Sequence, residues 1–399
     1  MNISPANRVN SVSEYYFSKK LKEIAEMNAK GLNVISLGVG SPDLPPSNQT
    51  IEALINDAQL PDAHGYQPYI GIVELRTAFA DFYKRWYAVE LNPANEIQPL
   101  IGSKEGILHI SMAFLNAGDG VLVPNPGYPT YTSVSRLCEA NVIYYDLDEN
   151  NAWQPNFEAL EKMDLSGVKL MWTNYPNMPT GAPATQELYE KLVAFGTKHN
   201  IVICNDNPYS FILQEPQSNN QEPKYLSILQ IEGAKDICIE LNSLSKSHNM
   251  PGWRMGMLAS NRQFVEWVLK VKSNIDSGQF RPMQRAAVAA LQNTDSWHNQ
   301  YNFSLYAQRR RIAENIMTTL GCTFDKRQVG MFLWGKIPDY LADAAQLADK
   351  VLYEAKVFVV PGFIFGSNGN RFIRISLCAN EKTLGDAAER IKKIMIRDE

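Results

Sequence analysis

The chain has 399 residues, and its 38 basic and 42 acidic side chains leave a net charge of −4. This weakly acidic balance, together with the lack of a long basic run, disfavours a nucleic-acid-binding protein. No apolar stretch approaches the roughly 20 residues that span a membrane, and a chain of this length predicts two domains rather than one.

The cysteines and the first residues indicate a compartment. Five cysteines lie far apart and form no C-x-x-C motif, which is typical of reduced thiols in the cytosol. The N-terminus lacks the basic and apolar regions of a secretory signal. The five histidines show no zinc-ligand spacing. We therefore expect a cytoplasmic protein without a metal site.

Apolar runs alternate with amphipathic helical patterns from about residue 100 to 270. The runs are continuous, which predicts strands buried on both faces of a parallel sheet. The expected strands are 121–124, 142–145, 168–173, 201–205, 236–241 and 255–259. Helical spacing of apolar residues predicts helices over 75–86, 107–115 and 187–199. This alternation predicts an α/β fold with a mostly parallel, doubly wound sheet covered by helices.

The last third of the chain has a different pattern. Helices are expected over 297–320, with Arg309, Arg310 and Arg311 on the solvated side, over 343–355 and over about 381–396. Strands are expected over 331–334, 357–360 and 371–377. This mixture predicts a smaller α+β domain.

The most informative stretch is SLSKSHNMPGWRMG, residues 243–256. Lys246 lies there between serines, and Arg254 follows eight residues on. A lysine amine forms a Schiff base with an aldehyde, and a guanidinium grips a phosphate with two parallel hydrogen bonds. An aldehyde and a phosphate in one molecule indicate pyridoxal 5′-phosphate (PLP). The run S-L-S-K-x-x-N-M-x-G-W-R-x-G resembles the cofactor-lysine signature of class I and II aminotransferases, the fold-type I PLP enzymes.

Two further motifs follow predicted strands, where open α/β sheets bind ligands. Asp206 and Tyr209 form a D-x-x-Y pattern, which by resemblance supplies a carboxylate for the pyridine nitrogen and a tyrosine for the ring hydroxyl. Such a carboxylate keeps the ring protonated and makes it an electron sink. By the same resemblance, the aromatic ring at Tyr128 stacks on the pyridine. Without Lys246, a capping aspartate and a core tyrosine would be the simpler interpretations.

Three serines are candidates for the phosphate. The segment GSKEG at 102–106 precedes a helix, and backbone N–H groups at a helix N-terminus bind phosphate. Ser103 adds a hydroxyl there, and Lys104 adds charge or faces the substrate. Ser243 matches the phosphate-binding serine of the family, opposite Arg254. Ser245 is a second candidate, with a helix N-cap as the alternative role.

One motif departs from the family pattern. The segment YPNMPTG at 175–181 resembles the N-P-T-G turn, whose asparagine binds the ring hydroxyl. Met178 holds that asparagine's position, and a methionine cannot donate the bond. Either Asn177, one residue earlier, reaches in, or Tyr209 acts alone. We expect Asn177 to reach in.

The substrate residues also follow from the resemblance. Arg374, in an R-I-S pattern, matches the arginine that grips the substrate α-carboxylate with two hydrogen bonds. Gly40, in the G-x-G-x-x-D segment 38–43, offers a backbone N–H to that carboxylate. Tyr15 and Tyr16 match an aromatic near the substrate mouth. Tyr66 matches a tyrosine that reaches the phosphate of the neighbouring subunit, and Ser277 is a further candidate there. The resemblance thus implies a homodimer with shared active sites.

The resemblance extends from about residue 35 to 378, and its motifs look most like the LL-diaminopimelate aminotransferase-like branch. It implies an N-terminal segment, 1–45, that packs with the small domain, a large PLP-binding domain, 46–290, and a small domain, 291–399. The expected activity moves an amino group from an amino acid to a 2-oxo acid by a ping-pong mechanism, with Lys246 as acid and base. The alternative is a PLP-dependent C–S lyase that works by β-elimination, and a PLP-binding module without activity is a weaker one. The amino donor cannot be read from the sequence.

Overall fold

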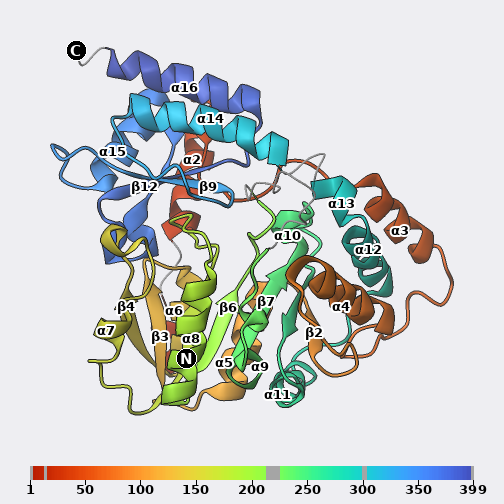
Figure 1. Cartoon of the computed structure of the whole chain (residues 1–399). Helices are drawn as coiled ribbons and strands as arrows, with labels where there is room; N and C mark the ends of the chain where they lie inside the picture. Colours follow the sequence, from red (N-terminus) through yellow and green to blue (C-terminus); the bar gives the residue numbers. More distant parts are fainter. Residues whose placement is uncertain (1–2, 13–15, 213–224, 299–302, 397–399) are drawn as a thin grey trace.

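The computed structural model describes residues 3–12, 16–212, 225–298 and 303–396. Two bodies share the chain: a large one built on a central sheet and a smaller one formed by the C-terminal elements and α2 (Figure 1). The expected α/β fold with a second, smaller α+β part is confirmed. The domain limits at residues 45 and 290 stay a prediction.

Within the described residues, the central sheet has seven strands in the order β2-β8-β7-β6-β5-β3-β4. The bounds are β2 Ile97–Leu100, β3 Gly120–Asn125, β4 Asn141–Asp146, β5 Val168–Thr173, β6 Val202–Asp206, β7 Cys238–Ser243 and β8 Gly256–Ala259. β8 is antiparallel to both of its neighbours, and the other pairings are parallel. All six expected strands form, and β2 is an addition.

Two hydrophobic cores cover the two faces of this sheet. Alternate residues of β5 face opposite ways, because Met171 packs with α4 and α8 whereas Leu170 and Trp172 pack with α5, α6 and α11. The helices are α3 Asn48–Ala58, α4 Val73–Tyr87, α5 Ser103–Phe114, α6 Pro129–Leu137, α7 Phe157–Leu160, α8 Gln186–His199, α9 Ala234–Ile237, α10 Leu244–Ser247, α11 Arg262–Lys272 and α12 Arg281–Gln292. Burial on both faces explains the continuous apolar runs of β3, β5, β6, β7 and β8, whereas the edge strand β4 is partly exposed.

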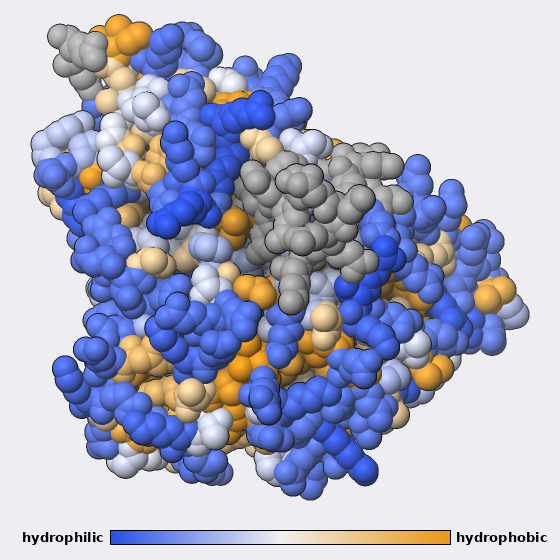
Figure 2. Space-filling model, viewed as in Figure 1, coloured by the Kyte–Doolittle hydropathy of each residue, from blue (hydrophilic) through white to orange (hydrophobic). Residues whose placement is uncertain are grey.

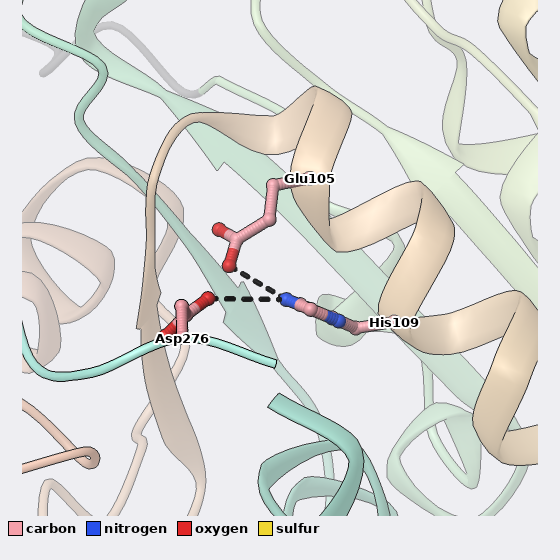
Figure 3. Close-up of side chains that lie close together, drawn as sticks. All are labelled: Glu105, His109 and Asp276. Carbon is pink, nitrogen blue, oxygen red and sulfur yellow. Dashed lines mark hydrogen bonds and ion pairs between the residues drawn. The ribbon is translucent and has the colours of Figure 1, made fainter. Parts of the chain in front are cut away.

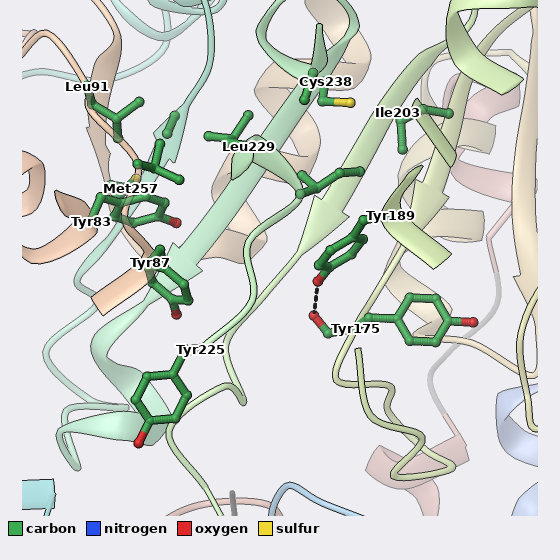
Figure 4. Close-up of a cluster of buried hydrophobic side chains, with 14 of the residues drawn as sticks. Tyr83, Tyr87, Leu91, Tyr175, Tyr189, Ile203, Tyr225, Leu229, Cys238 and Met257 are labelled. Carbon is green, nitrogen blue, oxygen red and sulfur yellow. Dashed lines mark hydrogen bonds between the residues drawn. The ribbon is translucent and has the colours of Figure 1, made fainter. Parts of the chain in front are cut away.

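The first of these cores is rich in tyrosine (Figure 4). Tyr83, Tyr87 and Tyr189 lie there among aliphatic side chains such as Ile203. Their hydroxyls find partners inside the core, such as the bond from Tyr189 to the carbonyl of Tyr175 at 3.0 Å. On the surface, the face shown in Figure 2 is mostly hydrophilic, with hydrophobic residues gathered between α8 and α4. No helix in the described residues is long and apolar enough to cross a membrane.

The smaller body surrounds an antiparallel sheet in the order β11-β12-β9. Its elements are α14 Phe303–Thr319, β9 Phe332–Lys336, α15 Ala344–Lys350, β10 Val357–Phe358, β11 Val360–Pro361, β12 Phe372–Ser376 and α16 Glu381–Met395, whereas the short helix α13 Thr294–Trp297 lies beside α12 in the large body. From the N-terminal segment, which contains α1 Asn7–Asn10, α2 Tyr16–Ala29 and β1 Ile35–Ser36, the side chains of Ile24, Val34 and Leu37 join its core. Residues 38–43, which follow β1 and are called the entrance segment below, are thereby attached to this body.

Two expectations for this part are wrong. Residues 357–360 do not form one strand, because β10 pairs with β1 whereas β11 pairs with β12. Arg309 is not solvated but 1% exposed, and its two terminal nitrogens lie 2.8 and 2.9 Å from the carboxylate oxygens of Asp43. An arginine can be buried when a carboxylate pairs with it in this bidentate way. The expected helix over 297–320 appears as α13 and α14, and residues 299–302 between them lie outside the described residues.

Candidate active site

A cavity of about 540 Å³ lies where the carboxyl ends of the central strands face the smaller body. Ser103, Tyr128, Asn174, Asp206 and Ser243 line it from the ends of β2, β3, β5, β6 and β7. From the other side it is lined by residues of α2, the entrance segment, β9, β12 and the loop before β12, namely Phe17, Leu21, Gly38, Val39, Gly40, Phe332, Phe365 and Arg374. The position agrees with the general rule for ligands of open α/β sheets.

Lys246 projects into this cavity from the short helix α10. Its Nζ donates to the carbonyl oxygen of Gly40 at 2.5 Å. Burial lowers the pKa of Lys246, and the positive charges of Arg254 and Arg374 lower it further. A lysine in such surroundings is neutral, and therefore nucleophilic, at lower pH than an exposed one.

Asp206 is 5% exposed at the end of β6. Its Oδ2 accepts a hydrogen bond from the hydroxyl of Tyr131 at 3.0 Å, whereas its Oδ1 is buried with no hydrogen-bond partner in the described part of the chain. Burial raises the pKa of Asp206 to about 7, against the effect of the Tyr131 bond. An unpartnered buried acceptor at this place fits the N–H of a protonated pyridine.

The opposite end of the cavity fits a phosphate. Ser103 begins α5, and Gly102 before it has a φ of +78°. A Cβ at Gly102 would lie 2.1 Å from Nη2 of Arg254, so only glycine lets the guanidinium approach this helix N-terminus. The hydroxyls of Ser243 and Ser245 lie 3.0 Å apart in the same wall. Ser243 is the N-cap of α10, so the alternative that Ser245 caps the helix is wrong.

Arg374 lines the cavity from β12 of the smaller body and is 4% exposed. Its Nη2 donates to the carbonyl of Gly38 at 2.9 Å, and its Nη1 lies 3.2 Å from Sδ of Met178. The guanidinium also lies over the ring of Phe332, 3.9 Å from the centroid. Met178 therefore contacts the arginine expected to bind the substrate.

Asn177 is not among the described residues that line the cavity. Its Nδ2 donates to the carbonyl of Asn174 at 3.1 Å, and its Oδ1 accepts from Thr180 at 2.7 Å. Asn174 lines the cavity instead, and its Nδ2 donates to the carbonyl of Asp206 at 2.5 Å while its Oδ1 accepts from the N–H of Met178. One Nδ2 hydrogen of Asn174 remains for a ligand, since an amide nitrogen has two.

Sequence reasoning missed both Asn174 and Tyr131. A signal existed for Asn174, because it directly follows β5 as Asp206 ends the neighbouring β6. Tyr131 had a weaker one: it lies one helical turn after Tyr128, in α6. The Tyr131 ring stacks on Trp172 with a centroid distance of 5.0 Å, which places its hydroxyl at Asp206.

The remaining candidates occupy different surroundings. Tyr128, Tyr209 and the exposed Lys104 line the cavity. Tyr66 is 95% exposed and does not line it, in the described structure. Tyr16 packs against Phe363 beside an adjoining cavity, while its neighbour Phe17 lines the main one. Tyr15 lies outside the described residues.

Comparisons with known proteins agree with this geometry. The family described as aminotransferase class I and II matches residues 33–391. LL-diaminopimelate aminotransferase of Dehalococcoides mccartyi (strain BAV1) is 38% identical over 95% of this chain and 96% of its own length. The Aquifex aeolicus enzyme of that name is 37% identical over 98% and 99%. Substrate-bound BacF of Bacillus subtilis is 35% identical, with a TM-score of 0.89, and the match covers 99% of this chain and 98% of that one.

The fold and the cavity thus define a PLP-dependent enzyme that transfers amino groups. The chain belongs to the class I and II aminotransferases. The curated relatives are aminotransferases, and neither supports the C–S lyase alternative.

Proposed function

We propose that this aminotransferase binds PLP and substrate in the cavity around Lys246, with the residues on its two sides in separate roles. The observation that carries the proposal is that Lys246, the open oxygen of Asp206 and the guanidinium of Arg374 line one cavity. Asp206 holds the ring nitrogen, Tyr128 and Tyr209 hold the ring, and Asn174 donates to its hydroxyl. Ser103, Ser243, Ser245 and Arg254 bind the phosphate.

Lys246 is the group that moves the proton. When bound, PLP supplies a protonated ring that takes up the electron pair left by the substrate Cα–H bond. Nζ of Lys246, whose pKa is lowered by burial, would remove the substrate Cα proton and deliver it to the C4′ carbon of the cofactor. Arg374 and the N–H of Gly40 hold the α-carboxylate. Water would supply the keto oxygen as the amino acid leaves as a 2-oxo acid, and the amino group would stay with the cofactor until a second 2-oxo acid receives it.

The substrate that fits best has an apolar side chain. The rings of Phe17, Phe332 and Phe365 surround the Arg374 guanidinium, and Leu21 and Val39 add apolar side chains to the same cavity. The distal end of diaminopimelate carries both an amine and a carboxylate, which need charged partners. Lys104 is the one basic residue of the described lining without a role above. LL-diaminopimelate is the second candidate, because the similar enzymes of D. mccartyi and A. aeolicus bear its name.

A panel of amino donors tests this proposal. Each donor is added to the PLP form in a half-reaction, and conversion is followed by the absorbance of the bound cofactor. We expect apolar and aromatic donors to convert the enzyme fastest, and 2-oxoglutarate or pyruvate to return it to the PLP form in the second half-reaction. Faster conversion by LL-diaminopimelate than by any apolar donor would refute the substrate class. Normal transfer by Lys246→Ala would refute the site.

We further propose a cytoplasmic homodimer in which Tyr66 completes the partner's phosphate site. Tyr66 is exposed and lies near other exposed apolar side chains such as Tyr69, which supports a covered surface. The five cysteines are free thiols, which supports a reducing compartment. Mixing Lys246→Ala and Tyr66→Ala subunits tests the sharing, because a mixed dimer regains one site with both native residues. Activity no higher than the sum of the separate variants would contradict it.

A further inference from the structure

A buried charged cluster lies beside the cavity, behind the first turn of α5. It consists of Glu105, His109, Lys272 and Asp276, and Figure 3 shows three of its members, with the carboxylates of Glu105 and Asp276 pointing toward the His109 ring. Nε2 of His109 lies 2.6 Å from Glu105 and 3.5 Å from Asp276. Nothing in the reaction described above uses these groups.

Lys272 fills the place that a metal ion would take between these carboxylates. The oxygens of Glu105 and Asp276 and the nitrogen of His109 are spaced as metal ligands can be. However, Nζ of the almost fully buried Lys272 lies 2.8 Å from Oε1 of Glu105 and 2.8 Å from both oxygens of Asp276. The ammonium already places a positive charge between the two carboxylates. The cluster is therefore an ion-pair network of the chain itself.

Glu105 connects this network to one wall of the phosphate site. It is the third residue of α5, and its second oxygen, Oε2, accepts the backbone N–H of Ile101 at 2.5 Å. A glutamate at this helix position commonly reaches back to backbone N–H groups that precede the helix. Ile101 precedes Gly102 and Ser103, and its carbonyl oxygen accepts a hydrogen bond from Nη2 of Arg254 at 3.5 Å. The carboxylate thus holds the loop that begins the phosphate site.

Asp276 connects the same network to the opposite wall. The segment it begins reaches Gln279, whose side-chain amide donates to the carbonyl of Arg254 at 3.0 Å and to that of Leu100 at 3.2 Å. Between them, Gly278 packs directly on the backbone of Gln67, next to Tyr66. Lys272 bridges Glu105 and Asp276, so it joins the loop before α5 to the segment that supports Arg254.

We propose that Glu105, Lys272 and Asp276 are positioning residues that fix the loop before α5 relative to Arg254, so that this ion-pair network determines the affinity for the cofactor phosphate. The inference rests on the proposed assignment of Ser103 and Arg254 to the phosphate. None of these three residues is among the described residues that line the cavity, and the network acts through the backbone of Ile101. Its loss affects the phosphate end of the cofactor and leaves the ring end intact.

The experiment compares the dissociation constants of PLP and of pyridoxal, which lacks the phosphate, for refolded or stripped cofactor-free enzyme. We expect Glu105→Ala and Lys272→Met each to raise the dissociation constant of PLP about tenfold or more, since each removes a charge-assisted bond from the network. The dissociation constant of pyridoxal should stay within about twofold of the unmodified enzyme. If Lys272→Met does not fold, Glu105→Ala is sufficient, because it leaves Lys272 paired with Asp276.

Two controls separate the possible failures. Lys235→Met removes a lysine that pairs with Glu96 at 2.9 Å away from this site, and it should change neither constant. Arg254→Met should weaken PLP but not pyridoxal, and unchanged PLP binding there would refute the phosphate assignment itself. If Arg254→Met weakens PLP while folded Glu105→Ala and Lys272→Met do not, the network has no positioning role. Equal weakening of PLP and pyridoxal in those two variants would also refute it, since that indicates general damage.

Discussion

The pKa of Asp206 makes the cofactor-free protein sensitive to pH in a way that Asp206→Asn should remove. The pKa of Asp206 in the fold is about 7, because burial disfavours the charged form, whereas the ordinary pKa of an aspartate is 3.8. The folded state therefore binds a proton that the unfolded state has lost between about pH 4 and 7. The contribution of this carboxyl to the free energy of unfolding is therefore largest below about pH 4, and it is lost as the pH rises toward 7. A rise in the pKa from 3.8 to about 7 corresponds to a loss of about 4 kcal/mol, as an order of magnitude.

The assay is denaturant unfolding of both cofactor-free proteins at several pH values. Other groups titrate equally in the two, so the difference in unfolding free energy between Asp206→Asn and the unmodified protein isolates this carboxyl. We expect the difference to rise by about 3 to 4 kcal/mol in favour of the variant between pH 4 and 8. With PLP the order reverses, because only the aspartate pairs with a protonated ring nitrogen. A difference that stays constant across this range would refute the reasoning.

Three further predictions follow from the cavity walls. Gly102→Ala should weaken PLP binding more than tenfold and lower stability, because its Cβ would lie 2.1 Å from Arg254 at a φ of +78°; cofactor titration and thermal unfolding check this. Arg374→Lys should lower kcat/KM for amino donors about a hundredfold through loss of the bidentate grip, with unchanged PLP affinity. Asn174→Ala should shift the pH at which the absorbance of bound PLP changes, whereas Asn177→Ala should not; an equal shift in both variants would contradict the assignment of Asn174.

The central sheet could be predicted well from the sequence, because strands that are buried on both faces consist of continuous apolar runs. Asp206 could be found because its D-x-x-Y pattern follows a predicted strand and resembles the family motif that supplies the carboxylate for the ring nitrogen. β2 was missed because its four residues, Ile97–Leu100, include a glutamine and a proline and are too short for a periodic signal.

Contacts between distant residues could not be predicted in this way. Arg309 occupies a helical pattern that suits a solvated face, and its partner Asp43 lies 266 residues away in the sequence. The N-P-T-G resemblance drew attention to Asn177, whereas the turn directs that side chain to Thr180 and leaves Asn174 at the cavity. One strand over 357–360 was a reasonable interpretation of a continuous apolar run, but the chain there changes partner from β1 to β12.

The ion pair between Arg309 and Asp43 has a consequence for how such an enzyme can acquire new substrates. It attaches the entrance segment to α14. Gly38 thereby rests on the same smaller core as Phe332 and Arg374. Most of the groups proposed to hold the cofactor lie in the large body, whereas Tyr209 packs in the smaller core. Substitutions in the smaller body can therefore change which amino acid the enzyme accepts, while the residues of the large body that hold the cofactor stay the same.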